Sequence, residues 1–303
     1  MPWCCSSPPV LIRATRLLKA NPVPYLIAEA MASNAGSTAT IVGNPQNALI
    51  GTVSGIDFAR FFLVLGPVAL TACVIVIAAV GLLFRRQMRT PLDRVGLAAE
   101  PARPEGVPLR GAAIVALLVA GLFASGPLGL DVSLVALLAG ALVLIVSPAR
   151  PGELLRMVDW VLLFFFAGLF VVIGGARQAG VLDIFLERID LSAGMAGIVS
   201  IHLVSVVASQ LVSNVPLTLL AVPLLERAGS DLLWLSLAAG ATLAGNLTVI
   251  GAVANIIVVE GASKEGVAVP WGQFFRVSVV VTALTVAASM ALLAAQWQLG
   301  WVR

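Results

Sequence analysis

Residues 33–51 read SNAGSTATIVGNPQNALIG, a stretch apolar enough for a membrane but interrupted by Gly36, Gly43 and Pro45. Six polar side chains stand among these breaks, namely Asn34, Thr38, Thr40, Asn44, Gln46 and Asn47. Such side chains are costly in lipid unless they line a protected cavity or bind a solute. The pattern therefore predicts a membrane helix that is broken part-way across the bilayer, with unwound backbone at the level of a binding site.

The composition places the rest of the chain in the membrane as well. Of its 303 residues 60% are hydrophobic and 11% are charged, and the mean hydropathy is +1.04. At about 20 residues per spanning helix, the chain has room for roughly eight to ten membrane segments. In such a chain, the net charge of +3 indicates orientation through basic loops, and we expect no nucleic-acid partner. Cys4, Cys5 and Cys73 lack the spacing of a metal or disulfide framework.

These features predict an all-α polytopic membrane protein built as an inverted-repeat transporter, with broken helices, a re-entrant hairpin and an incomplete first repeat. The first repeat, over residues 1–84, is expected to hold a short hairpin arm, a broken helix at 21–55 and a span at 59–84. A basic loop follows at 85–110. In the second repeat, over 111–303, we expect spans at 111–126, 129–147 and 159–173, a surface helix at 182–191, a re-entrant hairpin at 194–225, a broken helix at 232–260 and a span at 271–296.

An internal repeat supports this division. At a constant offset of 208, residues 37–50 (STATIVGNPQNALI) fall on residues 245–258 (GNLTVIGAVANIIV). The identical pairs are Thr40 with Thr248, Gly43 with Gly251 and Asn47 with Asn255. The two stretches thus predict two broken helices related by duplication.

The predicted topology agrees with the charges. Four spans and one hairpin separate the broken helices, so the two repeats are inverted. This arrangement puts 13 of the 18 Lys and Arg residues on the side of loop 85–110, which is therefore expected to be cytoplasmic in a multi-pass plasma (inner) membrane protein. The same offset carries residues 111–213, which hold three spans and the first arm and tip of the hairpin, to about −97 to 5, so that nearly all of their partners would lie before residue 1. This predicts an N-terminally shortened first repeat.

Three segments carry a resemblance to a known superfamily: PVPYLIAEAMASNAGSTATIVGNPQN, SNVPLTLLAVPLL and AGNLTVIGAVANIIVVE. They resemble the ion transporter superfamily that includes divalent-anion:sodium symporters, citrate transporters, arsenite permeases and one type of sodium/proton antiporter. The resemblance covers nearly the whole chain. It implies two inverted repeats, each with a re-entrant hairpin and a broken helix, in a homodimer whose transport domains move like elevators against a scaffold.

The resemblance also implies the candidate site residues. Those that would bind substrate or ion are Asn34, Thr40, Gly43, Asn44, Asn47, Ser213, Asn214, Pro216, Asn246, Thr248, Gly251 and Asn255. A possible Na⁺ site would use Ser213, Asn214, Asn246, Thr248 and Asn255. Half-helix N-termini suit an anion, whereas amide and carbonyl oxygens suit Na⁺. No other metal and no cofactor is expected.

The loop GNPQN helps to choose among the subfamilies. It holds Asn44 and Gln46 where arsenite permeases and the antiporters typically carry an acidic residue, and protonation at membrane depth needs an ionisable group. We therefore expect a non-enzymatic, secondary active symporter for a small anionic solute, driven by Na⁺ or H⁺ and embedded in lipid. An arsenite or metalloid permease, a sodium/proton antiporter and a truncated, non-transporting membrane scaffold are the alternatives. Glu29 and His202 are ionisable residues within membrane segments, and each is expected to be packed against a polar neighbour or to lie near an interface.

Overall fold

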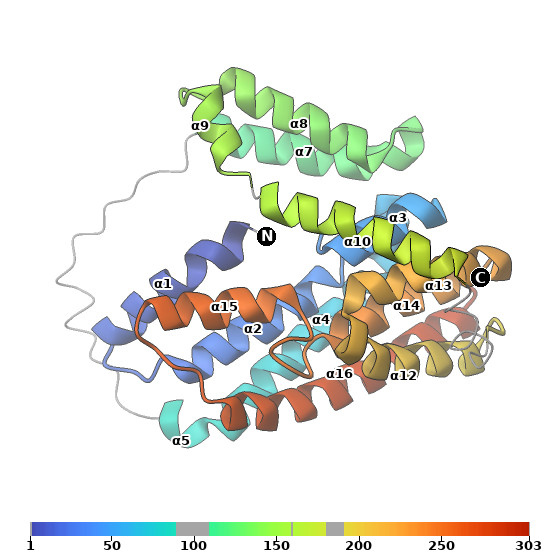
Figure 1. The fold of residues 1–303 in the computed structure, drawn as a ribbon. Helices are drawn as coiled ribbons and strands as arrows, with labels where there is room; N and C mark the ends of the chain where they lie inside the picture. The colour runs from blue at the N-terminus through green and yellow to red at the C-terminus, as the bar shows by residue number, and fades with distance from the viewer. Residues whose placement is uncertain (1, 89–108, 159, 180–190, 303) are drawn as a thin grey trace.

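The computed structural model describes residues 2–88, 109–158, 160–179 and 191–302 (Figure 1). These ranges contain fourteen helices and no strand. Four of the described helices are long and apolar enough to cross a bilayer: α4 (Phe58–Leu83), α7 (Leu109–Leu128), α12 (Met195–Val212) and α16 (Trp271–Gln298). Shorter apolar helices include α8 (Val132–Val146) and α14 (Asp231–Ala244). The predicted all-α polytopic membrane fold is confirmed.

Residues 33–51 do form an interrupted helix. Helix α2 (Val23–Ser37) ends before the glycine and asparagine residues of the break, and α3 (Pro45–Ser54) begins after them. Pro45 suits the first position of α3 because that position needs no backbone donor. Asn44 caps the helix, its side-chain oxygen accepting from the backbone N–H of Asn47 at 2.8 Å.

The second interrupted helix lies 208 residues later. Helix α14 is followed by residues 245–252 and then by α15 (Val253–Lys264). Asn44 and Ala252, the residues before α3 and α15, have closely similar extended backbones, with φ and ψ of −154° and 163° and of −143° and 142°. The duplication seen in the sequence is therefore repeated in the backbone.

Helix α14 is the centre of the molecule. All of its residues from Leu232 to Ala244 are buried, and α12 and α16 pack against it. Small side chains allow the close approach: a Cβ added at Gly240 would lie 3.3 Å from Cα of His202 on α12. The first broken helix packs in turn on α4, which contacts α16.

Helices α12 and α13 (Asn214–Ala228) form a hairpin that turns at Ser213. Helix α13 packs against α3, while α1 (Pro2–Leu17) packs against α15. The offset of 208 places residues 6–20 opposite residues 214–228, so α1 and α13 occupy related places in the two repeats. Each contacts the broken helix of the other repeat.

A second group of helices lies along one side of this core, at the top of Figure 1. It comprises α7, α8, the short α9 (Pro151–Arg156) and α10 (Trp160–Gln178). The α7–α8 hairpin contacts α4 through Phe123, whose ring meets those of Phe58 and Phe62 edge to face at 5.1 and 5.4 Å. Most other side chains of α7 and α8 are exposed and apolar, as expected for helices that face lipid.

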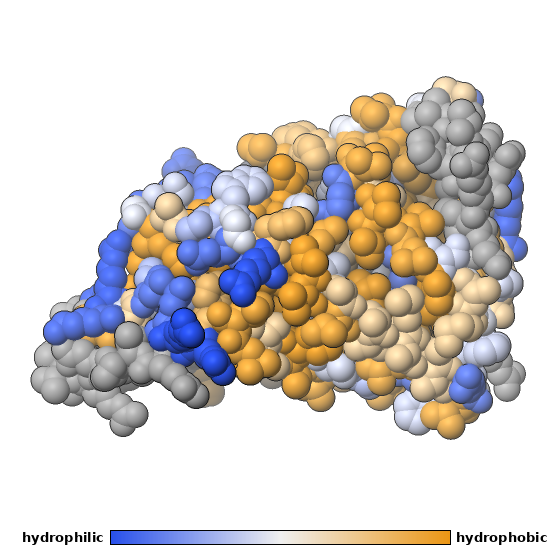
Figure 2. Space-filling model, turned by 90° about the horizontal axis from the view of Figure 1, so that it is seen from below, coloured by the Kyte–Doolittle hydropathy of each residue, from blue (hydrophilic) through white to orange (hydrophobic). Residues whose placement is uncertain are grey.

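The outer surface supports the same environment. Figure 2 shows a largely hydrophobic face, with hydrophilic residues gathered toward one end. Helix α5 (Arg85–Met88) begins the expected basic loop. The rest of that loop up to residue 108 and the expected surface helix at 182–191, except Leu191, lie outside the described residues.

Candidate functional site

Two asparagines hold the broken helices open in the same way. The side-chain amide of each donates two hydrogen bonds to carbonyl oxygens of its own break. Asn47 donates to the carbonyls of Ser37 and Thr40, both at 3.2 Å. Asn255 donates to the carbonyls of Gly245 and Thr248, both at 2.9 Å. All three pairs of positions are related by the offset of 208. The carbonyl groups freed by unwinding thus find partners within the protein, as membrane burial requires.

The two breaks are also linked to each other. The side-chain amide of Asn34, on α2, donates to Oδ1 of both Asn246 and Asn255, at 2.9 Å each. In the other direction, the Thr242 hydroxyl on α14 accepts from Asn44 at 3.0 Å and donates to Oδ1 of Asn47 at 3.4 Å. Asn34 and Thr242 are again 208 residues apart, so each repeat sends one polar side chain into the break of the other.

Close packing within each break explains its glycine. A Cβ added at Gly43 would overlap the backbone carbonyl of Ser37. One added at Gly251 would lie 2.8 Å from the carbonyl oxygen of Gly245 and 2.9 Å from Oε1 of Gln210. Both glycines are therefore required because of the close approach of backbone to backbone.

A small, partly open cavity lies where these elements meet. Its volume is about 30 Å³, and it is lined by Asn34, Asn44, Pro45, Gln46, Phe166, Ser213, Asn214, Val215, Ala252, Val253 and Ala254. The first residues of α3, α13 and α15 are all among these. The N-terminus of a helix carries a partial positive charge, so three helix ends direct positive potential toward one cavity. At α3 few N–H groups are free, because Pro45 has none and the N–H of Asn47 is bound by the side chain of Asn44. None of the lining side chains is charged.

The tip of the hairpin supplies strained and unsatisfied groups to this cavity. Ser213 has φ of +68°, a left-handed conformation that is uncommon for a residue other than glycine. The next side chain, Asn214, is 5% exposed, and its Oδ1 has no hydrogen-bond partner among the described residues. An unpaired buried oxygen is costly, and in native proteins it commonly marks a place for a ligand or an ion.

Gln210 connects the first arm of the hairpin to the second break. Its Oε1 accepts from the hydroxyl of Thr248 at 2.8 Å, and its Nε2 donates to the carbonyl of Ala244 at 2.9 Å. The same Thr248 hydroxyl also accepts from the backbone N–H of Gly251 at 3.0 Å. The hairpin and the second broken helix are therefore joined directly by hydrogen bonds.

The predicted site residues gather in this region in three ways. Asn34, Asn44, Ser213 and Asn214 line the cavity. Asn47, Thr248, Asn246, Asn255, Gly43, Gly251 and Thr40 belong to the breaks and their hydrogen bonds, and Pro216 lies in the first turn of α13. The role of these residues in binding stays a prediction.

Two of the five proposed Na⁺ ligands, Asn246 and Asn255, are engaged by the protein itself in this structure. Oδ1 of Asn246 and Oδ1 of Asn255 both accept from the amide of Asn34. A cation could use these two oxygens only after that amide had moved. Within the described residues, no three His, Cys, Asp or Glu side chains cluster as a metal site would require.

Three residues were missed at the sequence level: Phe166, Gln210 and Thr242. Gln46 was named among the polar side chains of the first break but was not assigned to the site. Gln46 lies inside the quoted GNPQN loop, and Thr242 stands at the position that the offset of 208 assigns to Asn34. Thr242 could therefore have been found from the repeat, whereas the repeat places Ala254 opposite Gln46. Phe166 and Gln210 carry no such signal, because only the packing of distant helices brings them to the cavity and the break.

The two ionisable residues of the membrane segments do not line this cavity. His202 is fully buried, and its ring nitrogens lie 2.8 Å from the carbonyl of Ile198 and 2.9 Å from the hydroxyl of Ser289. The first contact is to an acceptor, so Nδ1 carries the proton and Nε2 accepts from the hydroxyl. His202 thus joins α12 to α16, and Glu29 is half-buried on α2.

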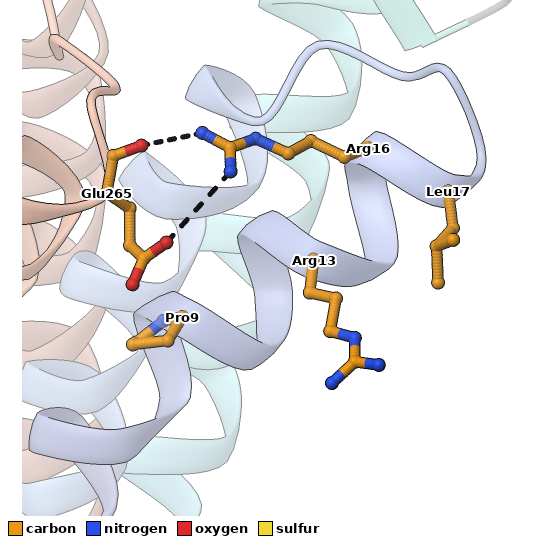
Figure 3. A pocket seen from close by; sticks show the side chains of 5 residues that line it. All are labelled: Pro9, Arg13, Arg16, Leu17 and Glu265. Carbon is orange, nitrogen blue, oxygen red and sulfur yellow. Dashed lines mark hydrogen bonds and ion pairs between the residues drawn. The ribbon is translucent and has the colours of Figure 1, made fainter.

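A larger hollow of about 450 Å³ lies elsewhere, between α1 and the end of α15 (Figure 3). It is lined by Pro9, Arg13, Arg16, Leu17 and Glu265. Arg16 binds both the backbone carbonyl of Glu265, at 2.6 Å, and its carboxylate, at 4.0 Å. None of the break or hairpin-tip residues reaches it, so we place the candidate site in the smaller cavity.

The fold and this site define a polytopic membrane permease, and comparison with known proteins identifies its family. A sequence model described as citrate transporter matches residues 6–240. An uncharacterized transporter of Mycobacterium tuberculosis is 32% identical over 295 residues, which cover 92% of this chain and 68% of the relative. An arsenical pump membrane protein of Escherichia coli is 23% identical, with coverage of 94% and 70%. The chain belongs to the citrate transporter family, which confirms the resemblance to ion transporter permeases.

Proposed function

We propose that this permease is a secondary active transporter for a small anion, coupled to Na⁺ or H⁺, and that the cavity at the helix breaks is its binding site. The observation that carries the proposal is the convergence of α3, α13 and α15, whose N-termini all meet one small cavity that is lined by uncharged side chains. Such helix ends bind anions through backbone N–H groups and the helix dipole.

A binding site without charged side chains suits a transporter, because a transporter must release its solute. A fixed cationic side chain would hold an anion tightly, whereas backbone donors and amides give the moderate affinity that release requires. The unpaired Oδ1 of Asn214 supplies an acceptor for a hydroxyl or protonated oxygen of the solute, or for a coupling cation. The family description makes a citrate-like carboxylate the first substrate class to test.

Alternating access follows from the repeat. We propose that the two broken helices and the hairpin move as one transport unit, in the manner of an elevator, against a scaffold that includes α7, α8 and α10. The cross-repeat bonds of Asn34 and Thr242 favour a single moving unit, because they tie the two breaks together. A homodimer in the inner membrane, with the basic loop 85–110 in the cytoplasm, is part of the same proposal.

A metalloid permease is the second candidate, and two observations favour it. Arsenical pump membrane proteins are among the relatives. The cavity volume of about 30 Å³ also suits arsenite better than a tricarboxylate in this conformation. Sodium/proton exchange and a non-transporting scaffold are the remaining alternatives. The uptake experiment separates anion transport from arsenite transport and both of them from these two alternatives.

That experiment is solute uptake into proteoliposomes under an imposed Na⁺ or pH gradient. Radiolabelled citrate, succinate, phosphate, sulfate and arsenite are compared for the wild type, Asn214→Ala and Gln298→Ala, whose side chain is an exposed amide on α16. We expect gradient-driven uptake that falls at least about tenfold in Asn214→Ala and stays unchanged in Gln298→Ala, since about 1.4 kcal/mol of lost binding is tenfold. No uptake of any solute under either gradient would overturn the proposal.

A further inference from the structure

Phe166 is the one cavity-lining residue that comes from the second group of helices. The other lining residues belong to the two broken helices, the hairpin or their cap residues, whereas Phe166 lies on α10. Helix α10 packs against α13, whose first turn forms another wall of the cavity (Figure 1). The aromatic ring therefore stands at the boundary between the proposed moving unit and its surroundings.

Its neighbours on α10 have a different environment. Phe164 is 74% exposed and Phe165 is 59% exposed, whereas Phe166 is half-buried. Residues two apart on a helix point about 160° away from each other, so Phe164 faces the opposite way. The chain thus contains a phenylalanine of the same helix that can act as a matched control.

The size of the cavity requires some wall to move. A volume of about 30 Å³ holds little more than a water molecule, and a carboxylate with several carbon atoms cannot enter it as it stands. The walls made by the breaks are held by the Asn34–Asn255 and Asn44–Thr242 hydrogen bonds, and opening them would leave buried polar groups unpaired. The phenyl ring of Phe166 makes no hydrogen bond and can turn at a smaller cost.

We propose that Phe166 is the gate and size filter of the candidate binding site. Its ring covers part of the cavity in this conformation, limits the access of water to the three helix ends and must swing away before a larger anion can bind. Exclusion of water strengthens the interaction of the helix ends with an anion, because the effective dielectric is lower in a dry site. The inference rests on the proposed function for its substrate class, but the position of the gate can be tested separately.

The first test measures selectivity by size. Uptake of acetate, succinate and citrate is compared among the wild type, Phe166→Ala, Phe166→Leu and Phe164→Ala. We expect Phe166→Ala to raise uptake of the largest anion relative to the smallest by roughly tenfold or more, with a smaller change in Phe166→Leu, because discrimination by a hydrophobic pocket is of this order. Phe164→Ala is expected to match the wild type. Unchanged ratios in folded Phe166→Ala and Phe166→Leu would refute the gate.

The second test needs no transport. In a background with Cys4, Cys5 and Cys73 replaced by Ser, Phe166→Cys and Phe164→Cys are treated in membranes with a membrane-impermeant methanethiosulfonate reagent applied from both sides. Replacing Phe166 by Cys removes the ring, so water and the reagent can reach a thiol at this position, whereas a thiol that faces lipid does not react. We expect labelling of Phe166→Cys alone. If the wild type moves no anion but this difference appears, the proposed function fails and the gate position stands; equal labelling of both variants would refute the gate position.

Discussion

Replacing Asn255 by Ala is expected to loosen the second break and to weaken its link to the first. The side chain is fully buried and takes part in three hydrogen bonds, to Gly245, Thr248 and Asn34, each at 2.9 Å. At about 0.6 kcal/mol for each side-chain bond in a membrane protein, the loss is about 2 kcal/mol. Two carbonyl groups left unpaired at membrane depth would raise this loss further.

The pseudo-symmetric residue supplies an internal comparison. Asn47 donates to its two carbonyl acceptors at 3.2 Å and accepts from Thr242 at 3.4 Å, so its side-chain bonds are longer. We expect Asn47→Ala to lower the free energy of unfolding less than Asn255→Ala does. A double-mutant cycle of Asn34→Ala with Asn255→Ala is expected to give a coupling of roughly 0.5–1.5 kcal/mol, because the two side chains bond directly.

The assay is reversible unfolding in mixed micelles with increasing SDS, followed by tryptophan fluorescence or circular dichroism. Gln298→Ala, an exposed amide on α16, is the control and is expected to change the free energy of unfolding by less than about 0.5 kcal/mol. A loss below this value in Asn255→Ala, or no coupling between positions 34 and 255, would refute the account of the two breaks as mutually bonded.

Three further outcomes test other parts of the structure. Gly43→Ala is expected to abolish uptake because its Cβ would overlap a backbone carbonyl, whereas Gly36→Ala, which has no such atom within 4 Å, should retain it in the same flux assay. Thr242→Val keeps the shape but removes the hydroxyl, and we expect a loss of about 1 kcal/mol in the SDS titration; an unchanged midpoint would contradict the assigned bonds. Arg60→Gln breaks an ion pair with Asp231 at 2.9 Å on a partly exposed surface, so a loss of less than about 1 kcal/mol that shrinks at high salt is expected, and a loss independent of salt would argue against it.

The broken helices could be predicted from the sequence because each depends on local chemistry. Pro45 cannot continue the hydrogen bonding of a preceding turn, and Asn44 can cap a new helix, so the interruption is written into adjacent residues. The duplication then located a second break without a proline. Residues 252 and 253 begin α15 with neither signal, and the offset of 208 was the evidence for them.

The hydrogen-bond partners of the polar side chains were harder to predict from the sequence. That Asn47 and Asn255 would matter was predicted, but their bonds to backbone carbonyls ten and seven residues earlier depend on how tightly each break folds back. The reach of Asn34 into the second break depends on the crossing of two helices more than 200 residues apart. A periodic pattern reports which face of a helix is polar but not which helix it meets.

The sequence by itself determined that this chain lies in a membrane, that two of its helices are broken and that these are copies of each other. Those conclusions follow from composition, from proline and glycine positions and from one constant offset. Each of these signals can be read within one segment or by comparing a segment with its repeat. Only the tertiary structure decided that three helix N-termini share one small cavity, that Asn34 and Thr242 each bond to the break of the other repeat and that Phe166 lines the cavity. The physical reason is that cavity shape and hydrogen-bond partners arise from the packing of helices distant in the chain, which is set by side-chain volume and close approach rather than by any single segment.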